Sequence, residues 1–255
     1  MYSGLLGKNI KYSLSPLIHN EKYKEDNIPL EYKIFDVDEN NLDIFINKAK
    51  KELVGFNVTI PYKESIIKYL DSIEYPANKI GAVNTVVNVN SKLIGYNTDY
   101  FGFISSLEKE NIKLEGKNAL IIGSGGAAKA IIYALRDLKI KSIDIALRNE
   151  KSIREHKAYI SKTINIHEEF DLTEYDIVIN CTPISGANHP NETPINIKKC
   201  NSKKIFYDLN YEPQNTLFMK IGEEYGCRVL NGYSMLLHQG YKAIKIWKKY
   251  LKENT

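Results

Sequence analysis

The chain has 255 residues, of which 43% are hydrophobic and 26% are charged, and its formal net charge is +4. These values are typical of a globular protein with one large domain or two smaller ones, and the basic excess is too weak to indicate a nucleic-acid partner. No stretch approaches the roughly 18 apolar residues of a membrane helix, and the first residues lack the apolar core of a signal peptide, so we expect no membrane partner.

The spacing of the cysteines and histidines limits which kinds of disulfide and metal site the chain can form. The three cysteines, Cys181, Cys200 and Cys227, are too few and too widely spaced for a disulfide framework, which favours a reducing, cytoplasmic setting. The five histidines show no ligand-like spacing, so we expect no metal.

Apolar runs alternate with amphipathic stretches in the first hundred residues. The runs predict three strands, over 2–6, 31–37 and 53–58. The stretches that follow them predict three helices, over 16–27, 39–51 and 62–71. This alternation is typical of βα units with a mostly parallel sheet. Residues 82–97 then predict a hairpin around a polar turn, and a helix follows over 99–110.

The alternation restarts after a break near residues 100–115. Strands are predicted over 118–123, 142–147, 176–181 and 203–209. Helices are predicted over 126–138, 213–226 and 233–252. Residues 185–202 are polar and predict a long loop. We therefore predict an α/β fold with two domains, residues 1–100 joined by the C-terminal helix 233–255, and residues 101–232.

Residues 120–130, LIIGSGGAAKA, predict a strand, a glycine turn and a helix start. Gly123, Gly125 and Ala128 fit G-x-G-x-x-A, in which the small residues allow a tight turn, a close pyrophosphate and close helix packing. Arg148 stands where an NAD site carries an acid, and its guanidinium suits the 2′-phosphate of NADP. The alternative to a dinucleotide site is a glycine turn with a purely structural role. The alternative for Arg148 is a surface arginine that binds no ligand.

Residues 57–64, NVTIPYKE, predict a strand that runs straight into a helix. Pro61 suits the first helical position, which puts Lys63 in the first turn. The partial positive charge of a helix start disfavours a cation there, and thus favours an amine that exchanges protons with a substrate. The alternative is a surface lysine at a helix start.

Two other polar segments carry residues that cap helices. Ser13 and Ser15 lie two apart, and Ser15 before Pro16 is a good N-cap; hydroxyls at a helix start also suit a carboxylate. Thr98 or Asp99 is expected to cap the helix that starts near residue 99.

Together these segments resemble the shikimate dehydrogenase family over nearly the whole chain. The motifs, in order, are Ser-x-Ser (13–15), Asn-x-Thr-x-Pro-x-Lys (57–63), Gly-Ala-x-Asn-Thr (81–85), Asn-Thr-Asp-x-x-Gly (97–102), the glycine turn and Gly-x-x-Met-Leu-x-x-Gln (232–239). The resemblance implies an N-terminal substrate domain and a Rossmann-like NADP domain with a parallel sheet. It also implies NADPH-dependent, reversible reduction of 3-dehydroshikimate to shikimate, in the chorismate route to aromatic amino acids.

The resemblance also implies roles for single residues. Lys63 and Asp99 would be the catalytic pair, with Lys63 as proton donor and acceptor or as a stabiliser of negative charge. The substrate would be held by Ser13, Ser15, Thr59, Lys63, Asn84, Asp99, Tyr211 and Gln239. The cofactor would be lined by Gly123, Ser124, Gly125, Gly126, Ala127, Arg148, Leu209 and Gly232.

Two segments depart from the family pattern. Residues 147–149 read Leu-Arg-Asn where the family often has Asn-Arg-Thr, and residues 180–183 read Asn-Cys-Thr-Pro where it has Asn-Ala-Thr. A quinate/shikimate dehydrogenase of broader cofactor use is one alternative, which Arg148 and the paired serines disfavour. A catalytically silent metabolite sensor is another, which Lys63 and Asp99 disfavour. We expect a monomer or a homodimer.

Overall fold

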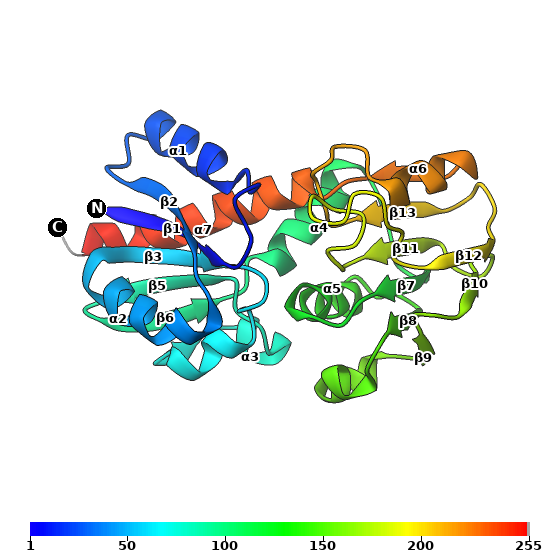
Figure 1. Ribbon diagram of the computed structural model, residues 1–255, viewed down its shortest axis with the longest axis horizontal. Helices are drawn as coiled ribbons and strands as arrows, with labels where there is room; N and C mark the ends of the chain where they lie inside the picture. The colour runs from blue at the N-terminus through cyan, green and yellow to red at the C-terminus, as the bar shows by residue number, and fades with distance from the viewer. Residues whose placement is uncertain (254–255) are drawn as a thin grey trace. The chain divides into compact units, whose positions relative to one another are not determined.

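The computed structural model describes residues 1–253 and divides into two compact units (Figure 1). Unit 1 comprises Met1–Phe103 and the C-terminal segment from Leu236, and unit 2 comprises Ile104–Met235. Both divisions fall inside helices, because α4 (Asp99–Lys109) and α7 (Tyr233–Glu253) each cross one. Both units are α/β, which confirms the predicted fold class.

Unit 1 is built on a six-stranded sheet in the order β2-β1-β3-β5-β6-β4. The strands are β1 (Tyr2–Gly7), β2 (Glu31–Asp36), β3 (Leu53–Val58), β4 (Ser72–Ile73), β5 (Thr85–Val89) and β6 (Lys92–Tyr96). The remaining helices are α1 (Ser15–Glu25), α2 (Leu42–Glu52), α3 (Ala77–Ile80), and the 3-10 segments η1 (Glu39–Asn41) and η2 (Ser65–Tyr69). β2 and β3 run parallel to β1, as predicted, but β5 is antiparallel to β3 and β6, so the whole sheet is mixed.

Both faces of this sheet are covered by apolar side chains. Neighbouring residues of a strand point to opposite faces, so each strand contributes to both. Leu6 and Val86 pack in one apolar cluster with side chains of α2. Leu5 and Val87 pack in a second cluster, which includes Trp247 of α7. The indole N–H of Trp247 also donates to the Val86 carbonyl at 2.9 Å, so α7 is fixed to the unit 1 sheet.

The predicted hairpin is present as β5 and β6. Its two loop residues, Asn90 and Ser91, have φ values of +52° and +65°. Two successive left-handed residues form the two-residue turn whose twist matches that of paired strands. The hairpin therefore aligns Thr85 with Tyr96, at the sheet edge where the polar segments lie.

The predicted helix over 62–71 is wrong. Residues 61–64 form turns, and only the 3-10 segment η2 follows. The reason is a tertiary hydrogen bond, because the Lys63 carbonyl accepts the Val83 N–H at 2.7 Å, while the Ile67 N–H bonds to Glu64. Pro61 follows a cis peptide bond rather than starting a helix. Lys63 therefore lies in a turn, and the argument from a helix start does not apply to it.

Unit 2 has the strand order of a dinucleotide-binding domain. Its parallel sheet runs β14-β13-β11-β7-β8-β9, which by position in the unit is 6-5-4-1-2-3. The strands are β7 (Asn118–Ile122), β8 (Ser142–Leu147), β9 (Lys162–Asn165), β11 (Ile177–Asn180), β13 (Ile205–Asp208) and β14 (Arg228–Leu230). The helices are α5 (Gly126–Asp137), α6 (Leu217–Glu224) and the 3-10 segment η3 (Glu150–Tyr159). This arrangement confirms the predicted Rossmann-like domain with a parallel sheet.

Two predictions in unit 2 need correction. Residues 185–202 are not all loop, because β12 (Asn196–Lys199) pairs with β10 (Glu169–Asp171) in a small parallel sheet. The helix predicted over 213–226 starts only at Leu217, because Thr216 caps it by accepting the Met219 N–H. Its predicted stop is confirmed by Gly226, which has a φ of +70°.

Candidate active site

The polar segments of unit 1 meet at one edge of its sheet. β1 and β3 are parallel neighbours, with Leu6 opposite Val58, so the segments after both strands leave at the same edge. β5 starts at this edge and β6 ends there, because the two are antiparallel. The segments that carry Ser13, Lys63, Asn84 and Asp99 are thereby brought to one edge from four places in the sequence.

Lys63 and Asp99 form a largely buried ion pair. Lys63 Nζ lies 2.6 Å from Asp99 Oδ2, and the two side chains are 14% and 7% exposed. Taking two charges out of water is costly unless further hydrogen bonds satisfy them. Asp99 has such a bond, because its Oδ1 accepts from Asn84 Nδ2 at 2.9 Å. Asp99 is not the predicted N-cap, because it is the first residue of α4, and Asn97 Oδ1 accepts the Tyr100 N–H there.

The amide of Asn84 is the centre of the hydrogen bonding around this pair. Its oxygen accepts the Thr98 backbone N–H at 2.6 Å. Its nitrogen lies within 2.9 Å of Thr98 Oγ1 and Asp99 Oδ1 and 3.2 Å from Gln239 Oε1. An amide nitrogen has two hydrogens for these three acceptors, so Asn84 must give up a partner if it is to bind substrate. Gln239 is brought here by α7, although it lies 155 positions away in sequence.

A second layer of polar side chains supports Asn84 from inside the sheet. Tyr32 donates to Asn57 Oδ1 at 2.8 Å, and Asn57 Nδ2 donates to Thr85 Oγ1 at 2.9 Å. The Thr85 hydroxyl lies 3.1 Å from Asn84 Oδ1. Every one of these side chains is buried. The chain of bonds from Tyr32 to Asn84 thus fixes which way both amides point.

The two serines are linked to each other at the start of α1. The Ser13 hydroxyl donates to Ser15 Oγ at 3.1 Å and accepts the Ser15 N–H at 3.2 Å. The predicted N-cap is wrong, because the N-cap position is Leu14 and Ser15 is the first residue of α1. Ser13 instead receives the first helical N–H, so both hydroxyls lie beside the positive end of α1.

His19 is hydrogen-bonded to the first turn of α1. Its Nδ1 lies 2.9 Å from the Ser15 carbonyl, which can only accept, so Nδ1 carries the proton. The ring stacks on Tyr32 with centroids 3.9 Å apart, and a Cβ added at Gly240 would lie 3.2 Å from its Cε1. Burial lowers the pKa of His19 to about 4, so the ring is neutral at physiological pH.

The glycine turn of unit 2 joins β7 to α5. Gly123 needs to be glycine because its φ is +99° and a Cβ would lie 2.8 Å from Thr182 Cγ2. Gly125 is different, because a Cβ there would meet nothing within 4 Å. No side chain caps the first turn of α5, and the turn before it follows the carboxyl end of β7 and lies against Thr182, after β11. The open space and the uncapped turn fit a pyrophosphate.

Three other predicted cofactor residues lie at the ends of strands in unit 2. Arg148 is exposed and directly follows β8, the second strand of the sheet. Gly232 is pressed against the segment after β13, because a Cβ there would lie 2.0 Å from the Leu209 carbonyl oxygen. Its glycine therefore has a packing role whether or not it touches cofactor.

Asp208 is a buried carboxylate at the end of β13 that sequence reasoning missed. Its Oδ2 accepts from the Thr216 hydroxyl at 2.7 Å, and its Oδ1 accepts from Asn180 and Asn210. Burial raises the pKa of Asp208 to about 6, although these bonds oppose the shift. The carboxylate ties the end of β11 to the segment that follows β13.

Comparison with known proteins decides the family. Residues 5–86 match the model of the shikimate dehydrogenase substrate binding domain. A shikimate dehydrogenase (NADP(+)) of Clostridium botulinum (strain Loch Maree / Type A3) is 50% identical over 249 residues, which cover 97% of this chain and 96% of that one. The chain belongs to the shikimate dehydrogenase family.

Solved structures of shikimate dehydrogenases agree with this. One in complex with NADP⁺ has a TM-score of 0.88 and 37% identity, covering 97% of this chain and 90% of that one. One from Thermus thermophilus, in complex with NADP(H) and shikimate, has a TM-score of 0.85 and 28% identity, covering 98% and 94%.

The shikimate dehydrogenase fold brings most predicted residues of unit 1 together. Lys63, Asp99, Asn84 and Gln239 form one bonded cluster, and the serines lie at the same sheet edge. Tyr211, predicted to reach the substrate, follows β13 in unit 2, and its role stays a prediction.

Sequence reasoning missed the roles of several supporting residues, namely Tyr32, Thr85, Thr98 and Asp208. Thr85 and Thr98 lie within the family motifs, so those motifs could have pointed to them. Among residues 1–253 no helix is long and apolar enough to cross a membrane. Among the side chains that the structure describes, no group of three or more His, Cys, Asp or Glu is placed to hold a metal ion.

Proposed function

We propose that this protein catalyses the NADPH-dependent, reversible reduction of 3-dehydroshikimate to shikimate. The observation that carries the proposal is the buried Lys63–Asp99 pair beside Asn84 and Gln239. The curated relatives named shikimate dehydrogenase (NADP(+)) support the same reaction. A place in aromatic amino-acid biosynthesis follows from that product.

Reducing a ketone to an alcohol requires hydride at carbon and a proton at oxygen. Bound NADPH would supply the hydride. Lys63 is proposed to supply the proton, which its bond to Asp99 permits, because an ammonium has three donors and that bond uses one. Asp99 keeps the amine in place, and Asn84 holds Asp99 in turn. In the oxidising direction the same amine takes the proton back.

The remaining polar groups of unit 1 suit the rest of the substrate. The hydroxyls of Ser13 and Ser15, beside the start of α1, suit the carboxylate of shikimate. Thr59, directly after β3, is proposed to bind its hydroxyls or its carboxylate together with Asn84 and Gln239. Tyr211, which follows β13, is proposed to bind the substrate as well.

The cofactor is proposed to lie on the glycine turn. Residues Gly123 to Ala127 would receive the pyrophosphate, and Arg148 would pair with the 2′-phosphate. Leu209 and Gly232 would also line the cofactor. Replacing Arg148 with alanine is expected to reduce the preference for NADP over NAD about tenfold or more, the loss of a charge-assisted bond. Equal preference before and after the change would remove Arg148 from this role.

The test is turnover of the purified protein, followed through absorbance of the reduced nicotinamide. Shikimate with NADP, shikimate with NAD, and quinate with each should be run side by side. Turnover confined to shikimate with NADP is the expected result. Comparable rates with NAD or quinate would indicate the broader dehydrogenase instead, and shikimate binding without turnover would indicate a sensor.

Lys63→Ala is the decisive variant, and it is expected to lower kcat by at least about 100-fold, the usual effect of losing a general acid. Lys68→Ala is a matched control, because Lys68 is an exposed lysine five positions along in η2. Near-normal turnover by Lys63→Ala would overturn the catalytic assignment.

A further inference from the structure

Two cysteines that the proposed reaction does not use lie side by side in unit 2. The sulfur atoms of Cys200 and Cys227 are 3.8 Å apart, and both are free thiols. They also share one acceptor, because both thiols lie within 3.5 Å of the Asn201 carbonyl oxygen. Cys227 is 8% exposed, whereas Cys200 is only half-buried and can be reached from solvent.

The pair joins two parts of unit 2 that belong to different sheets. Cys200 directly follows β12, which pairs with β10 in the small sheet. Cys227 directly precedes β14, the edge strand of the six-stranded sheet. Cys227 lies in the apolar cluster with Phe206 and Phe218, and Cys200 packs at the margin of that cluster.

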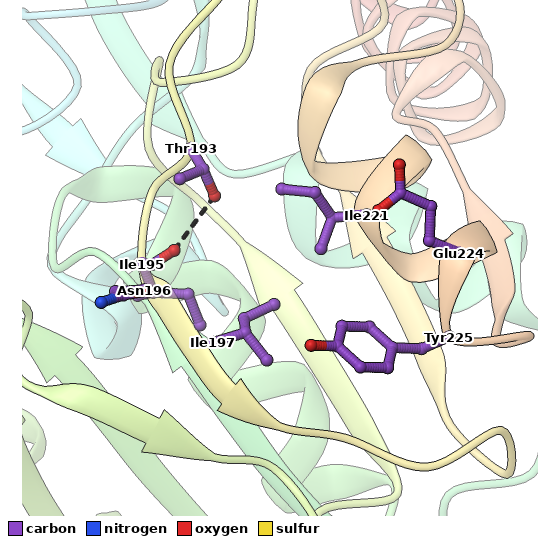
Figure 2. Close-up of a pocket in the computed structure, with 7 residues that line it drawn as sticks. All are labelled: Thr193, Ile195, Asn196, Ile197, Ile221, Glu224 and Tyr225. Atoms are coloured by element: carbon purple, nitrogen blue, oxygen red, sulfur yellow. Dashed lines mark hydrogen bonds between the residues drawn. The ribbon is translucent and has the colours of Figure 1, made fainter.

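A surface pocket lies between the chain segments that lead to Cys200 and Cys227. Its volume is about 410 Å³, and its walls come from the β12 segment and from α6. Figure 2 shows the ring of Tyr225, at the end of α6, directed toward Ile197 of β12. A covalent bond between Cys200 and Cys227 would therefore fasten the β12 wall to the chain that leaves the α6 wall.

We propose that Cys200 and Cys227 are a reversible oxidation site, at which a peroxide converts the two thiols to an intramolecular disulfide. Peroxide oxidises the more exposed Cys200 sulfur to the sulfenic acid, and one water leaves. The Cys227 sulfur then attacks that sulfur, the S–S bond forms, and the second water leaves. Two electrons pass from the thiols to the peroxide, and the two thiol protons end in the two water molecules.

The geometry suits this step. The sulfurs must close from 3.8 Å to a bond length of about 2.05 Å, and Cys200, at the margin of the cluster, is the partner with room to move. Burial, reinforced by Cys227, raises the pKa of Cys200 to about 11, while nearby Lys204 opposes the shift. The thiolate is therefore scarce at neutral pH, and the oxidation should be faster in mildly alkaline buffer.

The test is oxidation of the full chain by hydrogen peroxide at mildly alkaline pH. Thiols are counted under denaturing conditions, and the mass of the intact chain is measured. The count is expected to fall from three to one, with the loss of two hydrogens and a cross-linked peptide joining Cys200 to Cys227. Dithiothreitol should restore three thiols. A Cys181→Ser chain should give the same cross-link, and Cys200→Ser or Cys227→Ser should give none.

Three outcomes would overturn the proposal. The thiol count could stay at three, the chain could gain oxygen atoms without a cross-link, or the linkage could join two chains instead of one.

Limited proteolysis reads out what the bond would do. Trypsin cuts after lysine, and Lys198, Lys199 and Lys203 flank Cys200. Oxidation should slow cleavage there at least severalfold, because the bond ties β12 to β14. Peroxide-treated Cys227→Ser is the matched control and should be cut at the rate of the reduced protein. If the cross-linked chain were cut as fast as the reduced one, the disulfide would not fasten β12.

Discussion

The Tyr32 hydroxyl is connected to Asn84 only through the side chains of Asn57 and Thr85. Removing it therefore tests whether these buried hydrogen bonds affect the proposed reaction. It donates to Asn57, which supports Thr85 and through it Asn84. Tyr32→Phe removes this donor and leaves the ring that stacks on His19. We expect the free energy of unfolding to fall by about 1–2 kcal/mol, because a buried acceptor loses its partner. We also expect kcat to fall severalfold, with little change in KM.

Tyr96→Phe is a matched control for that prediction. Its hydroxyl bonds to the hydroxyl of Tyr250, also in unit 1, without touching the amide of Asn84. Urea unfolding and steady-state kinetics should therefore show lost stability with unchanged kcat. If Tyr32→Phe behaved in the same way, Tyr32 would support the fold but not the placement of Asn84.

His19 makes a prediction for pH. Its pKa is about 4 in the folded chain against an ordinary value of 6.5, so the folded state excludes a proton that the unfolded state binds. This group therefore has no effect above pH 6.5, and it lowers stability progressively as pH falls from 6.5 to 4. The full loss is about 3 kcal/mol, at roughly 1.4 kcal/mol per pH unit.

The measurement is urea unfolding across that pH range. His19→Gln keeps a donor for the Ser15 carbonyl but does not titrate, so its stability should fall less steeply with acid. His167→Gln, at an exposed position of unit 2, should follow the parent chain. Parallel curves for His19→Gln and the parent would contradict a buried, neutral His19.

At the scale of the element, the glycine turn separates packing from ligand binding. Gly125→Ala adds a methyl group that meets nothing within 4 Å, at a φ of −77° that alanine tolerates. We expect its melting temperature to change little and KM for NADPH to rise about tenfold or more, because the methyl group would occupy the space proposed for the pyrophosphate.

Gly232→Ala should above all lose stability. Its methyl group would lie 2.0 Å from a backbone oxygen, so the chain must shift, and we expect a loss of about 2 kcal/mol or more. Thermal unfolding and NADPH kinetics on both variants distinguish the cases. An unchanged KM for Gly125→Ala would assign the turn a structural role only.

The same scale shows what sequence reasoning can and cannot reach. Strongly periodic segments such as α5 and the strands β7 and β8 were placed nearly to the residue, because local burial alone determines them. The turn at Lys63 was mistaken for a helix, because Val83, twenty positions away, takes the carbonyl that a helix would use. β12 was missed because its three-residue pairing with β10 leaves little periodicity.

Motifs reached further into the site than local structure did. They identified Lys63, Asp99, Asn84 and Gln239, which the fold then brings into one cluster. They could not reveal that Asn97 caps α4, which leaves both oxygens of Asp99 for Lys63 and Asn84. Capping depends on which of three neighbouring polar residues faces the helix start, and that is fixed by tertiary contacts.

For the whole molecule, the proposal divides ligand binding between two units that each have their own core. Two apolar clusters cover the faces of the unit 1 sheet, and a separate cluster lies in unit 2. Amide hydrogen exchange reports local opening, so a ligand should protect the unit that holds it. Shikimate alone should slow exchange at 13–15, 57–63 and 97–99. NADP alone should slow exchange at 123–128 and near 148.

Lys63→Ala and Gly125→Ala test whether the protection by each ligand depends on its proposed binding residues. The first should lose protection by shikimate and keep protection by NADP, and the second should do the reverse, because each variant alters one unit. Protection of 123–128 by shikimate alone, or of 57–63 by NADP alone, in the parent chain would contradict independent binding. Protection of neither set by NADP would contradict the glycine turn as the cofactor site, even if turnover were observed.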